Sequence, residues 1–192
     1  MDANGANQTQ ITLGEKNVEV CPQISPDGAW LYYIQKNPSA STVWRKSMSD
    51  GRMEALTEPG KLAPDSFLSL SPDGKMLAFH NSNEKVIEDA EKQVYQVGII
   101  PVDNGSGPTF FNITASRLVV RWTSDGSALD YIENSADGAR IWRQVVKGKK
   151  PPELIVSLPE AFLHNFSWSA DGEKLVLSRG RQLNDAILLT NF

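Results

Sequence analysis

The sequence is poor in cysteine, in histidine and in long apolar runs. Its 192 residues include one cysteine, Cys21, and two histidines, and no apolar run is longer than six residues. A single cysteine excludes an internal disulfide and a cysteine-based metal site, so we expect no metal and no cofactor. Runs this short do not cross a bilayer, which takes about 20 apolar residues in a helix.

Positive charge is also in short supply. The chain carries 19 Lys and Arg against 23 Asp and Glu, a net charge of -4. Without a basic excess to contact a phosphate backbone, we expect no nucleic-acid binding. The first ten residues are polar and include Asp2, which is unlike a secretion signal, so we expect any export signal to stand upstream. A hydrophobic fraction of 40% with so small a net charge excludes an intrinsically disordered chain.

Four tetrapeptides that end in Asp-Gly line up at regular spacing along the chain. The copies are 25–28, 71–74, 123–126 and 169–172, and their Asp residues stand 46, 52 and 46 positions apart. Positions within each repeat are counted below from this Asp. Every copy has an apolar residue at position -3, a leucine at +4 and an apolar residue at +6. The alternation from +4 to +6 predicts a strand with one buried face.

The tetrapeptide has the composition of a tight hairpin turn. Pro at its second place presets φ, Asp bonds the backbone ahead of it, and Gly supplies a positive φ. We assign this structural role, rather than catalysis or calcium binding, to the acids and glycines of the four turns: Asp27, Gly28, Asp73, Gly74, Asp125, Gly126, Asp171 and Gly172. The four acids belong to different repeats, and we expect them to lie too far apart to act together.

Each turn opens a unit of four expected strands. Third strands are expected at Thr42–Met48, Tyr95–Val102, Arg140–Val146 and Asp185–Phe192, and fourth strands at Met53–Thr57, Phe110–Thr114 and Glu153–Ser157. Repeated four-stranded units of this length predict an all-β chain, a β-propeller of four-stranded antiparallel blades. The blades are expected near residues 14–58, 59–115, 116–158 and 159–192.

Two segments fall outside the repeats. Gln10–Leu13 has the sequence of a fourth strand. It either completes the last blade and closes a four-bladed ring, or ends a preceding blade of a larger propeller, which a homodimer would complete. The segment Asn83–Gln93 lengthens the second blade, and its alternating charge favours a solvated loop with room for one or two helical turns.

The turn, the Leu-x-aromatic after it and the Leu-Thr ending resemble the WD-like propeller repeat of TolB-type proteins, from Gln10 to Phe192. The stretch Asn165–Gly180 with Asp185–Phe192 is similar to the final propeller blade of bacterial proteins in which the propeller follows a serine/threonine kinase or winged-helix domain. The resemblance implies a sensory or protein-interaction module of a larger bacterial signalling or envelope protein, in a periplasmic or other extracytoplasmic location. The related prolyl oligopeptidase propeller implies an alternative, a domain that gates a hydrolase.

Sequence motifs for a nucleophile elbow, a phosphate loop or a dinucleotide site are absent. Cys21 stands in an alternating apolar segment, where we expect a small core residue rather than a nucleophile. We therefore expect a non-enzymatic propeller that binds a protein or peptide, or alternatively a small ligand. Innermost strands line a propeller's channel, which makes Arg121 and His164 candidate binding residues at the channel and its rim. The alternative is structural: a histidine bonded to nearby backbone and an arginine paired to a carboxylate.

Overall fold

The computed structural model describes residues 4–12, 17–87, 93–103, 105–115, 118–148 and 150–180. All regular structure in these residues is strand, which confirms the predicted all-β propeller class. No helix suited to crossing a membrane occurs in this described part. The chain divides into two compact units, the first formed by Met1–Lys85 with Gln96–Asn112 and the second by Val86–Tyr95 with Ile113–Phe192.

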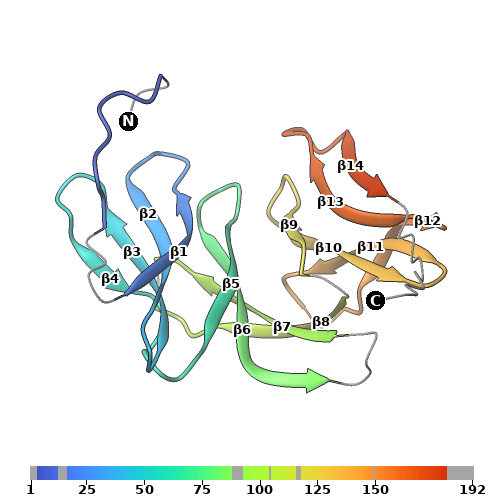
Figure 1. Cartoon of the computed structure of the whole chain (residues 1–192), viewed down its shortest axis with the longest axis horizontal. Coiled ribbons are helices and arrows are strands. Elements are labelled where there is room, and N and C mark those ends of the chain that lie inside the picture. The colour runs from blue at the N-terminus through green and yellow to red at the C-terminus, as the bar shows by residue number, and fades with distance from the viewer. Residues whose placement is uncertain are drawn as a thin grey trace, which may run out of the picture. The chain divides into compact units, whose positions relative to one another are not determined.

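Most of two antiparallel sheets lies in the first unit (Figure 1). The strands of the first sheet are β1 (Val18–Ile24), β2 (Trp30–Lys36), β3 (Ser41–Ser47) and β4 (Met53–Ala55). Those of the second are β5 (Pro64–Leu70), β6 (Met76–Ile87), β7 (Gln93–Pro101) and β8 (Thr109–Ala115). In each sheet the strands are ordered as in the sequence, which is the arrangement of a propeller blade.

The second unit repeats this pattern. One four-stranded sheet contains β9 (Val120–Trp122), β10 (Ala128–Ser135), β11 (Gly138–Val145) and β12 (Glu153–Pro159). A further sheet follows, in which β13 (Phe162–Trp168) pairs with β14 (Leu175–Gly180). The third strand expected for this blade, Asp185–Phe192, lies outside the described residues.

The four Asp-Gly turns have the same hydrogen bonds. In the first, the Asp27 carboxylate accepts from the Ser25 hydroxyl at 2.5 Å and from the Ala29 N–H at 3.0 Å. The Ser25 oxygen in turn accepts from the N–H of Trp30 at 2.9 Å. Equivalent bonds form around the other three acids, and the glycines have φ values of 68° to 75°. Each turn therefore fixes the register of the hairpin it joins.

The structure describes part of each of the two segments that lie outside the repeats. Residues 83–87 continue β6 as strand instead of forming helical turns, because pairing with β7 supplies backbone partners that an isolated turn of helix lacks. Gln10–Thr12 has no strand assignment, and the carbonyl of Ile11 accepts from Nζ of Lys46 at 2.5 Å. Leu13 lies outside the described residues, so closure of a blade by this segment stays a prediction.

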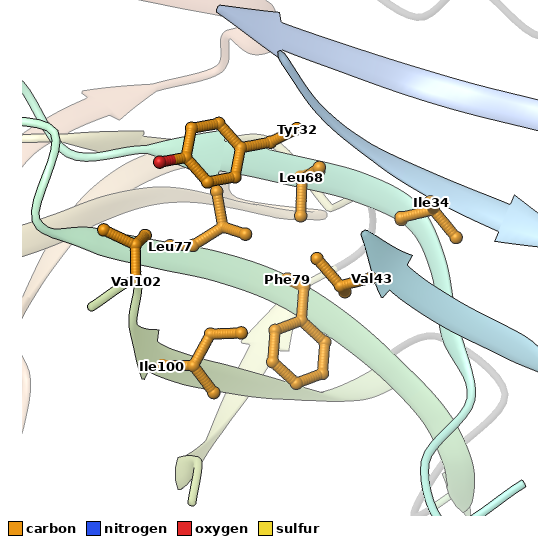
Figure 2. Close-up of a cluster of buried hydrophobic side chains, with 8 residues drawn as sticks. All are labelled: Tyr32, Ile34, Val43, Leu68, Leu77, Phe79, Ile100 and Val102. Atoms are coloured by element: carbon orange, nitrogen blue, oxygen red, sulfur yellow. The ribbon is translucent and has the colours of Figure 1, made fainter. Parts of the chain in front are cut away.

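The core of the first unit lies where its two sheets pack together (Figure 2). The alternating positions predicted to face inward, such as Leu77 and Phe79 at +4 and +6 of the second repeat, are fully buried. The cluster consists of Tyr32, Ile34, Val43, Leu68, Leu77, Phe79, Ile100 and Val102. A matching cluster in the second unit consists of Ile132, Ala139, Ile141, Leu163 and Phe166. Hydrophobic burial between consecutive sheets is thus the main stabilising contribution in each unit.

Gly98 in β7 leaves room for a core aromatic ring. A Cβ atom at residue 98 would stand 2.5 Å from Cζ of Phe79 and 3.0 Å from Cε1 of Phe110, whose rings meet edge to face. We expect Gly98→Ala to lower the free energy of unfolding by about 1–3 kcal/mol through overpacking. Urea denaturation measures the loss, and a second change, Phe79→Leu, should recover part of it. Strictly additive losses from the two changes would contradict a steric cause.

Candidate functional site

The first strand of three sheets contains a β-bulge. The pairing register shifts between Val20 and Gln23 in β1, between Pro64 and Leu68 in β5, and between Leu163 and Asn165 in β13. A bulge leaves a residue unpaired and re-aims its side chain, and bulges are frequent beside binding sites. The sequence pattern did not indicate these bulges.

His164 stands within the bulge of β13. Its side chain is exposed, and its ring lies 5.0 Å from the ring of Phe162 at an angle of 57°. Its Nε2 is 3.0 Å from where a Cβ atom of Gly180 would be. The structure thus presents the imidazole to solvent, beside an aromatic ring and the end of β14.

Arg121 lies in the middle of β9 and is half-buried. Its guanidinium donates to the carbonyl of Val120 at 2.8 Å and to Oδ1 of Asn165 at 3.0 Å. Burial lowers the pKa of this guanidinium. Within the described residues it has no carboxylate partner, in contrast to the ion pair considered as its structural alternative. Asn165 is the neighbour of His164 in β13. The hydrogen bond from Arg121 to Asn165 therefore joins β9 to β13 beside His164, the other candidate residue.

A pocket of about 210 Å³ opens between the turns of the third and fourth repeats. Its lining consists of Thr123, Ser124, Asp125, Ser127, Arg143, Trp168, Asp171 and Gly172. The turns approach closely because residue 172 is a glycine, whose missing Cβ would stand 2.6 Å from Oγ of Ser124. Asp125 and Asp171 therefore both line this pocket. Among the described residues no cluster of three or more His, Cys, Asp and Glu could hold a metal ion.

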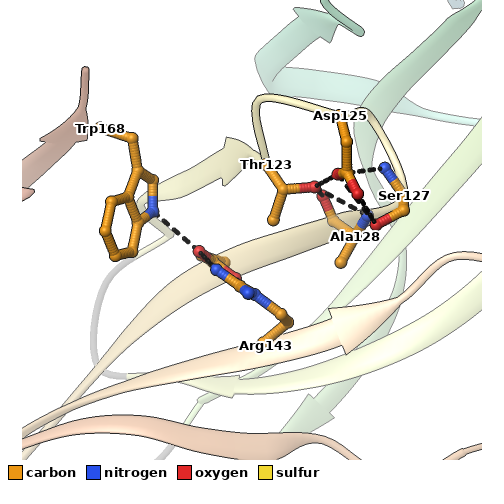
Figure 3. A network of polar contacts seen from close by, with 7 residues as sticks. Thr123, Asp125, Ser127, Ala128, Arg143 and Trp168 are labelled. Atoms are coloured by element: carbon orange, nitrogen blue, oxygen red, sulfur yellow. Dashed lines mark hydrogen bonds and ion pairs between the residues drawn. The ribbon is translucent and has the colours of Figure 1, made fainter. Parts of the chain in front are cut away.

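The acids of this pocket are held in their charged form. Asp125 accepts from the Thr123 hydroxyl at 2.6 Å and from both the N–H and the hydroxyl of Ser127 (Figure 3). These bonds lower the pKa of Asp125 to about 2. The hydroxyl of Ser169 lowers the pKa of Asp171 in the same way. Both carboxylates are therefore anionic at neutral pH.

An ion pair with a buried carboxylate lies beside the pocket. Asp130 has an exposed fraction of 0% and accepts from Nε and Nη2 of Arg143 at 2.7 and 2.9 Å. Its second oxygen also accepts from Nε1 of Trp168 at 2.8 Å, so the carboxylate connects β10, β11 and β13 (Figure 3). Asp130 raises the pKa of Arg143 in return. The sequence analysis did not identify Asp130. The available signal was its charge, because position +5 carries an uncharged residue in each of the other three repeats.

We expect acid to destabilise the second unit partly through Asp125. Its pKa in the folded state lies below that of the unfolded chain, so its contribution is present above about pH 4 and is lost as the pH falls towards about 2. Urea unfolding at several pH values across this range measures the slope. The slope should be smaller in Asp125→Asn, and equal slopes in the two proteins would contradict the assignment.

No family model matches the chain. One curated relative, the uncharacterized protein Atu1656 of Agrobacterium fabrum, is 24% identical over 135 residues, which cover 69% of this chain and 45% of that protein. The chain thus spans less than half the length of that relative.

Solved structures with the same fold are those of β-propeller proteins. TolB from Acinetobacter baumannii matches 84% of this chain, with 20% identity and a TM-score of 0.55, over 37% of its own chain. The apo form of prolyl oligopeptidase B from Galerina marginata matches 88%, with 15% identity and a TM-score of 0.61, over 28% of its chain. The aligned parts are propeller domains. By its repeats, its sheets and these likenesses, the chain is built of β-propeller blades that resemble those of TolB and the prolyl oligopeptidases.

Proposed function

We propose that this chain is a non-enzymatic β-propeller module that binds a protein or peptide through β9 and β13. The observation that carries the proposal is Arg121, a half-buried guanidinium whose described partners are neutral oxygens. A guanidinium favours carboxylates, which it binds with two parallel hydrogen bonds. The exposed ring of His164, near Asn165, supplies a second contact. The ligand class is therefore a segment with an acidic side chain or a free C-terminal carboxylate.

The setting we propose is a larger bacterial signalling or envelope protein with an extracytoplasmic location. Its support is the likeness of the repeats to TolB-type propellers and of Asn165–Gly180 to the last blade of multidomain propeller proteins. In such a protein, these blades would supply the sensory or scaffolding surface, and any catalysis would belong to other domains.

We expect Arg121→Gln to weaken binding of acidic peptides by about tenfold, since a hydrogen-bonded charge pair is lost. The probe is a fluorescein-labelled peptide mixture with Asp and Glu at the last positions and a free carboxyl end, followed by fluorescence anisotropy. The matched control is Arg179→Gln, which removes an exposed arginine from β14 of the same unit. Equal weakening by both changes, or no peptide bound by the parent protein, would contradict the proposal.

A second candidate function is a propeller that gates a hydrolase. It is favoured by the match to prolyl oligopeptidases, of which one structure carries a 35mer hydrolysis and macrocyclization substrate. On this proposal the chain has no hydrolytic activity by itself and restricts access to a catalytic domain joined to it. Arg121→Gln would then leave peptide affinity unchanged, and deleting the blades would widen the size range of substrates that the joined hydrolase cleaves.

A further inference from the structure

The pocket between the turns of the third and fourth repeats has the size of a side chain. Every residue that lines it belongs to the second unit. Its volume of about 210 Å³ equals that of about seven waters. Pockets for whole small molecules have about 300–1,000 Å³. The end of a long side chain, or a ligand group of similar size, is therefore what this pocket can hold.

The charge in and around the pocket is negative. Asp125 and Asp171 line it as carboxylates, and their described partners are hydroxyl and N–H groups. Arg143 also lines it, but its guanidinium already forms two hydrogen bonds with the carboxylate of Asp130. Three carboxylates thus stand against one guanidinium, which favours a cationic ligand.

The oxygens that remain available belong to two different carboxylates. Oδ1 of Asp125 and Oδ1 of Asp171 accept the bonds that fix their own turns. Oδ2 of Asp125 accepts one described bond, from the hydroxyl of Ser127 at 2.8 Å, and no described bond ends on Oδ2 of Asp171. A guanidinium binds best to both oxygens of one carboxylate, whereas an ammonium donates three bonds in separate directions. The free oxygens therefore suit an ammonium better than a guanidinium.

An aromatic ring forms another wall of the pocket. The indole of Trp168 lies across from the turn that carries Asp125 (Figure 3). Its N–H donates to Asp130 at 2.8 Å, which holds the ring in place, and the guanidinium of Arg143 stands 5.9 Å from the ring centroid. Indole rings attract cations, and the methylene stem of a long amine packs on apolar surface while its charged end stays in water.

The equivalent place in the first unit has different chemistry. Position -1 is Pro26 there and Ser124 here, and position -3 of the following repeat is Leu70 there and Trp168 here. Leu70 packs against the apolar core cluster of its unit. Asp73, the turn acid of that following repeat, has a lysine Nζ 4.0 Å away. The polar lining and the uncompensated acids are thus features of this one pocket rather than of the repeat.

We propose that this pocket binds a primary alkylammonium group, which is the end of a lysine side chain or of a free diamine. The ammonium donates to Oδ2 of Asp125 and to Oδ2 of Asp171, and its methylene stem packs on the indole of Trp168. This site is separate from the one proposed at Arg121, because the two ligand groups carry opposite charges.

Titration of the full chain with acetyl-lysine methylamide, followed by proton–nitrogen correlation NMR, tests this proposal. The indole N–H of Trp168 and the backbone amides of Ser127 and Gly172 should shift and reach saturation. Acetyl-norleucine methylamide, which has the same stem without the ammonium, should leave these signals in place. Cadaverine supplies the free-diamine arm. Tighter binding of the lysine amide would identify a protein side chain as the source of the ammonium, tighter binding of cadaverine would identify a free amine, and both results support the site.

Variants at the pocket separate specific binding from a general attraction of cations. Asp171→Asn should weaken binding by about two- to fivefold, since it removes one exposed charge and keeps an acceptor for the turn. Ser124→Pro should weaken binding at least as much, because it introduces the residue found at this place in the first unit. The matched control is Asp73→Asn, which removes a turn acid from the first unit and should leave the affinity unchanged.

Three results would overturn the proposal. They are signals that do not saturate with either amine, equal shifts with the norleucine amide, and an affinity that both Asp171→Asn and Ser124→Pro leave at the parent value. Circular dichroism checks folding, and each variant serves alone if the other is unfolded. Because neither amine probe carries a carboxylate, the result is independent of the acidic-peptide test of Arg121.

Discussion

Replacing Asp130 with alanine should lower the free energy of unfolding of the second unit by about 2–4 kcal/mol, because two groups lose a buried acceptor. Asp130 is fully buried and accepts three hydrogen bonds, two from Arg143 and one from Trp168. Its removal leaves the indole N–H of Trp168 and the guanidinium of Arg143, which is 32% exposed, without their acceptor. It also deletes a side chain that connects β10, β11 and β13 through polar bonds.

Urea unfolding followed by tryptophan fluorescence measures this loss, since the indole of Trp168 is itself a partner. The matched control is Glu54→Ala in the first unit. Glu54 pairs with Arg45, which occupies the same repeat position as Arg143, but its side chain is 33% exposed. There we expect a loss of at most about 1 kcal/mol. Comparable losses from the two changes would show that burial of the pair does not decide its contribution.

Asn134→Ala should lower the free energy of unfolding by about 2–4 kcal/mol, because it leaves two buried backbone groups without partners. Nδ2 of Asn134 donates to the Leu163 carbonyl at 3.0 Å, and the Leu163 N–H donates to Oδ1 at 2.8 Å. Leu163 is fully buried and adjoins the bulge at His164, where the pairing register of β13 shifts. The amide of Asn134 thus replaces backbone bonds that the sheet does not supply there.

Hydrogen exchange at the Leu163 amide reports this contact directly, and its protection should fall in Asn134→Ala. Asn134→Asp, which keeps an acceptor but loses the donor, should give an intermediate loss. The first unit offers the control, because Lys36 and Asp65 occupy the same repeat positions and form an ion pair that is about one-third exposed on each side. Lys36→Met should cost less than about 1 kcal/mol. A larger loss from Lys36→Met than from Asn134→Ala would contradict this account.

The elements that follow from local chemistry were predictable from the sequence. The turn acids and glycines, with the leucine at +4, place the hairpins because each side chain acts on the backbone within a few residues of itself. Residues 83–87 were misread because helix propensity is local, whereas pairing of β6 with β7 is set by tertiary structure. Asp130 and the Asn134 amide act across blades, between residues separated by 29 to 38 positions. Such contacts depend on how sheets stack, which periodicity does not encode.

The bulges in β1, β5 and β13 bear on how much the exposed side chains of these strands can vary. Each bulge places one or two extra residues on the first strand. Sliding that strand by one residue would move the bulge away from its position on the partner strand and turn the buried side chains outward. Alignment within each hairpin is thereby secured by main-chain geometry rather than by the identity of exposed side chains. Residues such as His164 are then free to be exchanged for others, so one scaffold can present different recognition surfaces without realigning its strands.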